Sequence, residues 1–371
     1  MKRLREPLRE ALIPYLVARL VVIGALGLAH FIVDRIHPVA AGVATRVHSG
    51  LLGWDAGWYA SIARFGYGPL GHQSLRFFPS VPLLTRAVAW FPGLGDGPAL
   101  VLVANVAALA ATSLLFVLVQ RETGDLAVAR RSLWILSLIP ASFVLVMGYA
   151  ESTLLALAIG CFLALRRSRP NFALAGALGF AAALTRPIGV LLALAVATEL
   201  WRTWSGLAWA QRMVGLLATT APVAGLLAFL VWSDLAAGDL WAPLRVQFES
   251  GHHGGIADPF LTLARDAPGI LHHHVGTALH VPWVVLALAL LVVCGRRLPA
   301  SYTVFAGAVL AVALAGTNLD SFERYALSAF PLTVAAALIC REPRVERGVL
   351  VVLAGGLAGY ALLAFLNISV P

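Results

Sequence analysis

The chain has few charged residues. Only 12% of its 371 residues are Asp, Glu, Lys or Arg, and Lys2 is the single lysine. Soluble domains carry about 25% charged residues. This low charge, together with 60% hydrophobic residues and a mean hydropathy of +0.85, excludes an ordinary soluble protein. The composition predicts an all-α polytopic membrane protein.

The sequence also lacks the motifs of disulfide, nucleotide and metal chemistry. Its three cysteines, Cys161, Cys294 and Cys340, lie in or at the end of apolar runs and are expected to be small hydrophobic residues. No GxxxxGK[ST] run is present, so a nucleotide-phosphate loop is excluded. The runs His252-His253 and His272 to His274 contain adjacent side chains that diverge in regular structure, and no HExxH motif occurs. We therefore expect no bound metal and no cofactor.

The net charge of +9 does not indicate nucleic-acid binding, because the basic residues stand in short clusters between apolar spans. This distribution is the positive-inside pattern, in which Lys and Arg mark cytoplasmic loops. The clusters are residues 1–10, Arg121 with Arg130 and Arg131, residues 166–169, residues 296–297 and residues 341–347. We expect a lipid bilayer as partner and no nucleic acid.

About 11 transmembrane helices are predicted within one integral membrane domain, residues 1–371. The apolar spans are 11–33, 98–119, 132–148, 152–165, 172–184, 188–200, 213–232, 281–295, 301–316, 326–340 and 348–367. The first is interpreted as a retained anchor. Thr185 to Pro187 could join two short spans or kink one long helix, and charge parity favours two. The N-terminus is then inside, and the long segments 34–97 and 233–280 are external loops.

The first external loop contains WDAGWYASIARFGYG, residues 54–68, which predicts an interfacial helix. At helical spacing Trp54, Trp58, Ile62 and Phe65 share one face. Asp55 and Tyr59 occupy the neighbouring face, which places an acid at the boundary between lipid and water. Asp55 is either a helix cap or a chemical group, and the spacing alone does not distinguish them.

Further ionisable residues map to the same side of the predicted topology. Such residues near membrane depth usually mark a pathway or a site. Arginines can grip a phosphate with a bidentate fork, so the set indicates an anionic lipid-linked substrate. It comprises Arg64, Arg76, Arg86, Glu151, Arg186, Asp320, Glu323 and Arg324.

The sequence resembles the PIG-V type mannosyltransferases in four motifs. WDAGWYASIARFGYG followed by RFFPSVPLLTR is similar to that family's first-loop motif, and YAES, LTRPIGV and SFERYALSAFP resemble its other patches in order. The resemblance implies a GT-C type glycosyltransferase with its active site on the non-cytoplasmic face. It also implies a polyprenyl-phosphate-linked sugar donor, usually mannose, and an inverting reaction.

The resemblance further implies roles for single residues. Asp55 matches the catalytic base, which takes a proton from an acceptor hydroxyl. Residues expected to bind the donor phosphate or sugar are Arg186 and Arg324, then Arg64 and Arg86, with Glu151, Trp54, Tyr59, Tyr149 and Tyr325. Structural alternatives remain for several: Glu151 could cap a helix, Arg186 could extend to the membrane surface, and Arg324 could pair with Glu323 or Asp320.

The high content of Ala, Leu, Val, Gly and Arg, with a single Lys, is typical of a GC-rich genome and therefore favours a bacterial plasma membrane. The active site is expected to face outside the cytoplasm. The acceptor is then expected to be an envelope glycan, a glycolipid or a protein. Two other functions compete with a glycosyltransferase. A lipid-linked substrate transporter or flippase would require polar residues along a membrane pathway, and a noncatalytic subunit of an envelope-assembly complex would require a stable partner.

Overall fold

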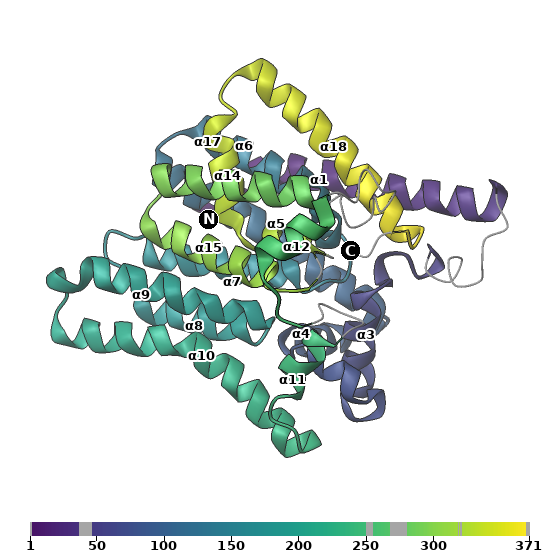
Figure 1. The fold of residues 1–371 in the computed structure, drawn as a ribbon, viewed down its shortest axis with the longest axis horizontal. Coiled ribbons are helices and arrows are strands. Elements are labelled where there is room, and N and C mark those ends of the chain that lie inside the picture. The colour runs from purple at the N-terminus through teal and green to yellow at the C-terminus, as the bar shows by residue number, and fades with distance from the viewer. Residues whose placement is uncertain are drawn as a thin grey trace. The chain divides into compact units, whose positions relative to one another are not determined.

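The computed structural model describes residues 2–36, 47–249, 255–267, 280–317, 319 and 321–368. These residues form helices joined by short turns (Figure 1), and their only β pairing is an isolated antiparallel bridge between Ile256 and Gly316. The all-α prediction is confirmed. The helices divide into two compact units, residues 1–64, 81–156 and 336–371 in the first and residues 65–80 and 157–335 in the second.

In the first unit, α1 (Lys2–Phe31) packs against α5 (Asp96–Thr123), α6 (Leu126–Leu138) and α18 (Pro343–Phe365). The turn from α5 to α6 has clear local causes. Gly124 adopts the left-handed conformation that ends α5, with φ of 66°. The Asp125 side chain then accepts hydrogen bonds from the amides of Ala127 and Val128 at the start of α6.

The second unit contains seven helices relevant here: α8 (Phe172–Ala183), α9 (Leu192–Thr203), α10 (Trp209–Ala237), α14 (Val281–Arg297), α15 (Ala300–Leu314), α16 (Phe322–Ser328) and α17 (Phe330–Ile339). Small residues let α8 and α10 approach backbone to backbone. A Cβ on Gly176 would lie 2.8 Å from Ala218 Cα, and one on Gly225 would lie 2.5 Å from the Phe180 carbonyl oxygen. This seam requires glycine.

Each predicted span contains helical structure, but most of these helices are shorter than a membrane crossing requires. Four spans are long and apolar enough to cross a membrane alone, within the described residues: Arg5–Arg35, α5, α10 and α18. Helices α16 and α17 form a fifth candidate that is bent by 84°. The structure therefore confirms several membrane-spanning helices without fixing the predicted count of 11.

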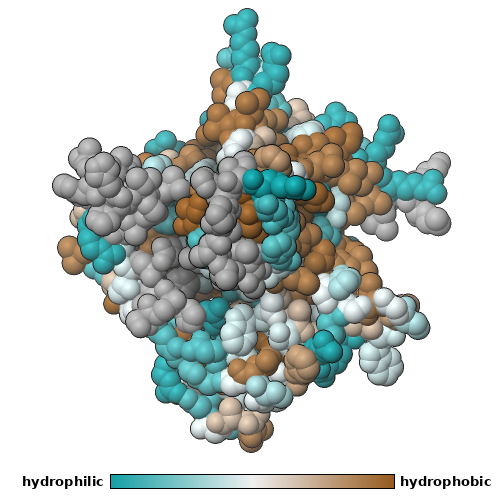
Figure 2. Space-filling model, turned by 90° about the vertical axis from the view of Figure 1, so that its right-hand side faces the viewer, coloured by the Kyte–Doolittle hydropathy of each residue, from teal (hydrophilic) through white to brown (hydrophobic). Residues whose placement is uncertain are grey.

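The exposed surface of these helices suits lipid. Ile13 and Leu20 of α1 are 62% and 70% exposed, and Val351 of α18 is 72% exposed. Figure 2 shows apolar residues gathered at the surface of one face. Apolar side chains on long helices are stable there when the solvent is hydrocarbon. The chain is a multi-pass membrane protein.

The break at Thr185 to Pro187 joins two antiparallel helices. Arg186 is extended, with φ of −154° and ψ of 149°, and Pro187 begins a short 3₁₀ turn. Arg166, which precedes α8, donates to Glu199 near the end of α9 at 3.0 Å. The chain therefore forms two short helices here, α8 and α9, which pack against each other. That each of them crosses the membrane stays a prediction.

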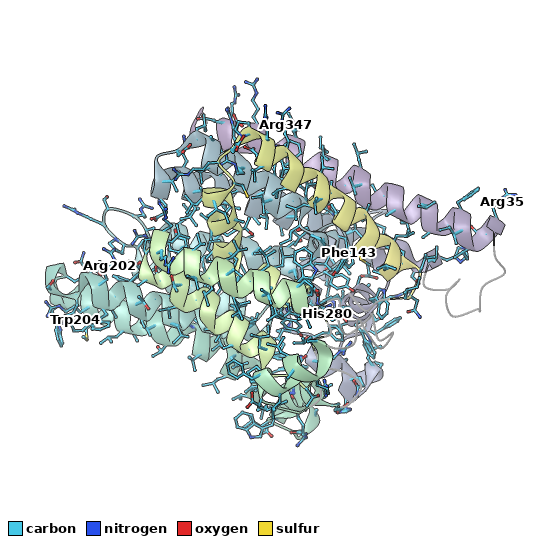
Figure 3. The ribbon with its side chains drawn as sticks, turned by 45° about the horizontal axis from the view of Figure 1, so that its top comes forward. Arg35, Phe143, Arg202, Trp204, His280 and Arg347 are labelled. Atoms are coloured by element: carbon cyan, nitrogen blue, oxygen red, sulfur yellow. The ribbon has the colours of Figure 1, made fainter. Side chains whose placement is uncertain are left out.

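Within each unit, segments that the charge pattern assigns to the cytoplasmic side contact one another. In the first unit Arg130 pairs with Glu10 at 2.7 Å, and Arg131 pairs with Glu346 at 2.9 Å. In the second unit, the buried Glu199 accepts from Arg166, Arg202 and Ser301. Figure 3 shows Arg202 and Trp204 together at the end of α9.

The two long segments predicted to be external also meet. Glu249 accepts a hydrogen bond from Gln73 at 2.7 Å and lies 3.0 Å from His72 Nε2. Gln247 donates to the Arg76 carbonyl oxygen at 2.9 Å. These contacts join segment 34–97 to segment 233–280, and they support the prediction that both lie on one side of the membrane.

Candidate functional site

The first-loop motif begins with a strained turn. A 3₁₀ turn, Gly50–Leu52, leads through Gly53 and Trp54 into α3 (Asp55–Phe65). Trp54 has φ of 57°, a conformation that costs a non-glycine residue about 1–3 kcal/mol. Its indole Nε1 donates to the Ala364 carbonyl oxygen of α18 at 3.0 Å, which holds the turn in place. Asp55 is consequently the first residue of α3, where the helix N-terminus stabilises a negative charge.

Tyr149 contacts Asp55 directly, although 94 positions separate the two residues. The Asp55 amide donates to the Tyr149 hydroxyl at 3.4 Å, and the Tyr149 side chain is fully buried. Next to it, the Gly148 amide donates to the Leu51 carbonyl oxygen at 3.1 Å. The first-loop motif and the YAES motif are therefore joined on both sides of the turn that presents Asp55.

Gly148 permits this contact because it has no side chain. A Cβ there would lie 2.8 Å from Leu100 Cδ2 and 3.3 Å from Ala56 Cβ. Real Cβ atoms essentially never approach a neighbour as closely as 2.8 Å. A glycine at this position brings the chain against α3 and sets the place of Tyr149.

Glu151, a predicted site residue, lies two positions beyond Tyr149. It is the first residue of α7 (Glu151–Leu165), and it is 1% exposed. A buried carboxylate is costly unless polar groups or charges compensate it, and the N-terminus of α7 supplies part of that compensation. This placement puts Glu151 in the first turn of α7, and both the helix-cap alternative and the binding of sugar hydroxyls stay predictions.

The predicted aromatic face of α3 is only partly formed, because Trp54 precedes the helix and Ile62 is buried. The residues that α3 buries are Ala56, Tyr59, Ile62 and Ala63. Phe65 is 55% exposed. The helix begins after Trp54, so that indole does not continue the stripe and instead bonds to α18. Tyr59, expected to bind substrate, is 5% exposed and packs in the buried face.

Two predicted arginines stand at the far end of α3. Arg86 of α4 (Ser80–Ala89) donates from Nε to the Ala63 carbonyl oxygen at 2.7 Å. This contact satisfies a carbonyl group that the helix end leaves without an intrahelical donor, so Arg86 has a structural role. Arg64 is exposed in the last turn of α3. Phosphate binding by either arginine stays a prediction.

In the second unit, Arg186 and Arg324 converge on Tyr325. Their guanidinium carbons lie 5.1 Å and 5.6 Å from the centroid of its ring. Cation–π contact stabilises each arginine at the aromatic face. Because two like charges beside one ring repel each other, this arrangement favours an anion between or beside them.

The sequence did not reveal a buried pair, one member of which, Glu323, directly precedes Arg324 in the chain. His280 Nδ1 lies 2.8 Å from both carboxylate oxygens of Glu323, and both side chains are less than 10% exposed. Figure 3 labels His280 at the start of α14. The predicted partner of Arg324, Glu323, thus contacts His280. Asp320 and the two histidine runs, 252–253 and 272–274, lie outside the described residues.

Helix α16, which carries Glu323, Arg324 and Tyr325, is half of a broken helix. Ser321 precedes it with φ of 62°, and the chain turns by 84° at Ala329 before α17. Discontinuous helices of this kind place backbone and polar groups at binding sites in membrane proteins. The bend is a structural reason for three polar residues to lie together here.

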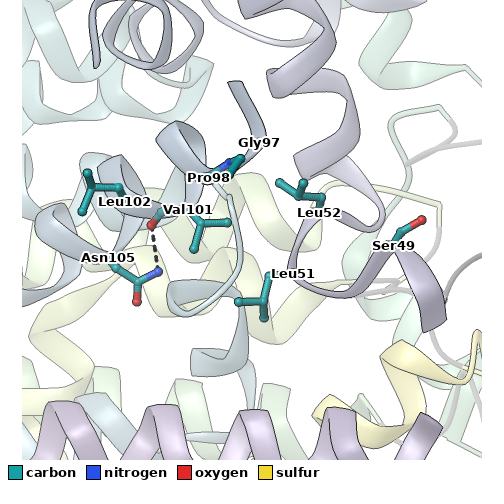
Figure 4. Close-up of a pocket in the computed structure, with 8 residues that line it drawn as sticks. All are labelled: Ser49, Leu51, Leu52, Gly97, Pro98, Val101, Leu102 and Asn105. Carbon is teal, nitrogen blue, oxygen red and sulfur yellow. Dashed lines mark hydrogen bonds between the residues drawn. The ribbon is translucent and has the colours of Figure 1, made fainter. Parts of the chain in front are cut away.

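An open pocket of about 530 Å³ lies between the 3₁₀ turn that precedes α3 and the start of α5 (Figure 4). The 3₁₀ turn supplies Leu51 and Leu52, and α5 supplies Val101 and Leu102. Asn105 donates to the Val101 carbonyl oxygen at 2.9 Å and to the Val146 carbonyl oxygen at 2.9 Å. The lining is therefore mostly apolar, with Ser49 and Asn105 as its polar side chains.

Comparison with known proteins identifies the fold. The chain matches no protein-family model and no curated protein sequence. Its structure is similar to that of ArnT from Cupriavidus metallidurans bound to undecaprenyl phosphate, with a TM-score of 0.52 and 15% identity over 89% of this chain and 77% of that one. Archaeal oligosaccharyltransferase AglB from Archaeoglobus fulgidus, in complex with an inhibitory peptide and a dolichol-phosphate, matches with a TM-score of 0.48 and 12% identity over 96% of this chain and 55% of that one. The protein has the GT-C fold, as predicted.

Proposed function

We propose that the protein is an inverting membrane glycosyltransferase that moves mannose from a polyprenyl-phosphate donor to an acceptor hydroxyl outside the cytoplasm. The observation that carries the proposal is the contact between Asp55 and Tyr149, which fixes a first-loop acid at the N-terminus of α3. The motifs shared with PIG-V type mannosyltransferases support it. The GT-C fold and the undecaprenyl phosphate bound to ArnT support a lipid-linked donor.

In the proposed reaction Asp55 acts as general base. Its carboxylate takes the proton of an acceptor hydroxyl while the oxygen attacks the anomeric carbon of the sugar. The bond from that carbon to the phosphate oxygen breaks, and polyprenyl phosphate leaves with the electron pair. Attack opposite the leaving group inverts the anomeric configuration. The helix N-terminus favours the negative charge of Asp55, and Tyr149 holds the backbone that carries it.

Arg186 and Arg324 would bind the phosphate. Negative charge grows on the phosphate oxygens as the bond to the sugar breaks, so fixed guanidinium groups stabilise the transition state more than the ground state. Tyr325 keeps both groups in place through its ring. Arg64 and Glu151 are further candidates, for the phosphate and for sugar hydroxyls respectively.

The proposal places the protein in a bacterial plasma membrane with the active site facing outside. The acceptor would be an envelope glycan, a glycolipid or an exported protein. The test is to incubate the purified protein with radiolabelled polyprenyl-phosphate mannose and membrane extract, and to identify the labelled product. Transfer with inverted configuration supports the proposal. Movement of the intact donor across vesicles without transfer would support a flippase, and activity only with a co-purified partner would support a noncatalytic subunit.

A further inference from the structure

Three metal-ligating side chains meet at the end of α1, away from the residues discussed above. His30 lies in the last turn of α1, Asp34 lies in the π-helical turn Ile32–Ile36 that follows, and His48 immediately precedes the next described turn. Arg35, labelled in Figure 3, marks this end of the helix. One ligand atom from each of the three residues lies within 4.8 Å of the other two.

The distances suit a shared ion more than a set of hydrogen bonds. His30 Nδ1 lies 3.6 Å from Asp34 Oδ2, and His48 Nε2 lies 3.5 Å from Asp34 Oδ1. An N–H···O hydrogen bond measures about 2.7–3.2 Å. Ligands bound to Zn²⁺ at about 2.0–2.2 Å in a tetrahedron are about 3.4 Å apart. Both pairs are already close to that spacing, and the imidazole rings meet edge to face with centroids 5.2 Å apart.

The ligand types select a class of metal. Two imidazoles and one carboxylate bind Zn²⁺ and related transition metals, whereas Ca²⁺ and Mg²⁺ prefer sites made only of oxygen. Three protein ligands leave a fourth position for water or another donor. All three side chains are partly or fully exposed, so an ion can reach them from solution.

The site would tie the end of α1 to the chain that leads into the first-loop motif. His48 lies two residues before the 3₁₀ turn Gly50–Leu52, and Leu51 of that turn accepts the hydrogen bond from Gly148. A metal ion that binds His30, Asp34 and His48 in the folded protein and not in the unfolded chain stabilises the fold.

We propose that His30, Asp34 and His48 form a binding site for a divalent transition metal of the Zn²⁺ class, which fastens the start of the first external segment to α1. The site is independent of the proposed glycosyl transfer, and no step of that reaction passes through the ion.

The test uses full-length protein purified in detergent through a tag without histidine, and stripped with a chelator. Zn²⁺ is titrated against it by competition with a chromophoric chelator. We expect one tight site per chain, with Kd raised at least 10-fold in Asp34→Asn and in His48→Ala. His72→Ala is the matched control, because His72 is also an exposed histidine beside a carboxylate, Glu249, and should leave Kd unchanged.

The absorption of bound Co²⁺ and the unfolding temperature test the same three residues independently. Co²⁺ in place of Zn²⁺ should give the absorption bands of a tetrahedral ion in the wild type, and these should vanish in His48→Ala. Zn²⁺ should raise the unfolding temperature of the wild type but not of Asp34→Asn. An equal loss of binding in His72→Ala, or tight binding that survives both cluster variants, would overturn the assignment.

Discussion

Replacing Gly148 by alanine tests how closely packing controls the position of Asp55. The added methyl group would lie 2.8 Å from Leu100 and 3.3 Å from Ala56, so either the Leu100 side chain or the chain at Gly148 must move. Two contacts depend on its place: the hydrogen bond from Gly148 to the Leu51 carbonyl oxygen, and the contact of Tyr149 with the Asp55 amide. Both join the YAES motif to the turn before α3.

The structure sets the size of the effect. Forcing a methyl group into a packed core costs about 1–3 kcal/mol of unfolding free energy. A displacement of about 1 Å between catalytic groups can reduce a rate about 100-fold. We therefore expect Gly148→Ala to lower kcat for sugar transfer 10-fold or more, with a smaller effect on KM for the donor, since the change lies beside the base.

The assay measures transfer rate and thermal unfolding on the same preparations. Gly355→Ala is the control, because nothing lies within 4 Å of a Cβ at Gly355 in α18, and alanine should stabilise that helix by about 0.5–1 kcal/mol. Adding Leu100→Ala to Gly148→Ala should remove the clash and recover part of kcat. Wild-type kcat in Gly148→Ala would refute the argument that this close approach positions Asp55.

Three further predictions follow from individual contacts. Tyr149→Phe removes the acceptor of the Asp55 amide and should cost about 1 kcal/mol, seen as a kcat decrease of less than 10-fold; an unchanged kcat would show that Tyr149 does not hold the base. Arg186→Lys keeps the charge but loses the planar fork beside Tyr325, so donor KM should rise several-fold, and a change confined to acceptor KM would contradict phosphate binding. Glu199→Ala removes the shared partner of Arg166 and Arg202, which are 17% and 51% exposed and stay in reach of water, so it should destabilise the fold by about 1–3 kcal/mol in denaturant unfolding while the activity per folded molecule is kept.

The positions of the helices could be predicted because they depend on local properties of the sequence. Apolar runs mark the spans, and Gly124 with Asp125 marks a helix end and a helix start. Pro187 after an extended Arg186 marks the break between α8 and α9. Arg166 and Arg130 each contact acids from other predicted inner segments, which agrees with the grouping by charge parity, while the membrane side of these segments stays a prediction.

The details of the site could not be predicted because they depend on the path of the backbone. Trp54 in a left-handed conformation starts α3 one residue later than the pattern suggests, and its indole bonds to α18 instead of joining the aromatic face. No periodicity links Tyr149 to Asp55. The pairing of His280 with Glu323 likewise joins residues 43 positions apart.

The metal-ligand cluster could be predicted from the sequence only in part. His30 and Asp34 are four residues apart at a helix end, which is a spacing that sequence inspection can detect. The third ligand, His48, reaches them only because the chain returns after segment 35–47. Neighbouring histidines in runs are more visible in a sequence, but adjacent side chains diverge, so the spaced residues make the better site.

The measurement that tests the central claim most directly is the initial rate of sugar transfer from polyprenyl phosphate by Asp55→Asn. The substitution keeps the size and the helix position of the side chain but removes its ability to accept a proton. Asp96→Asn is the matched control, since Asp96 is also the first residue of a helix in the first external segment. We predict that Asp55→Asn loses transfer by at least 1,000-fold while it folds and binds donor normally, and that Asp96→Asn retains the wild-type rate. Equal rates in the wild type and Asp55→Asn would contradict the assignment of Asp55 as the base.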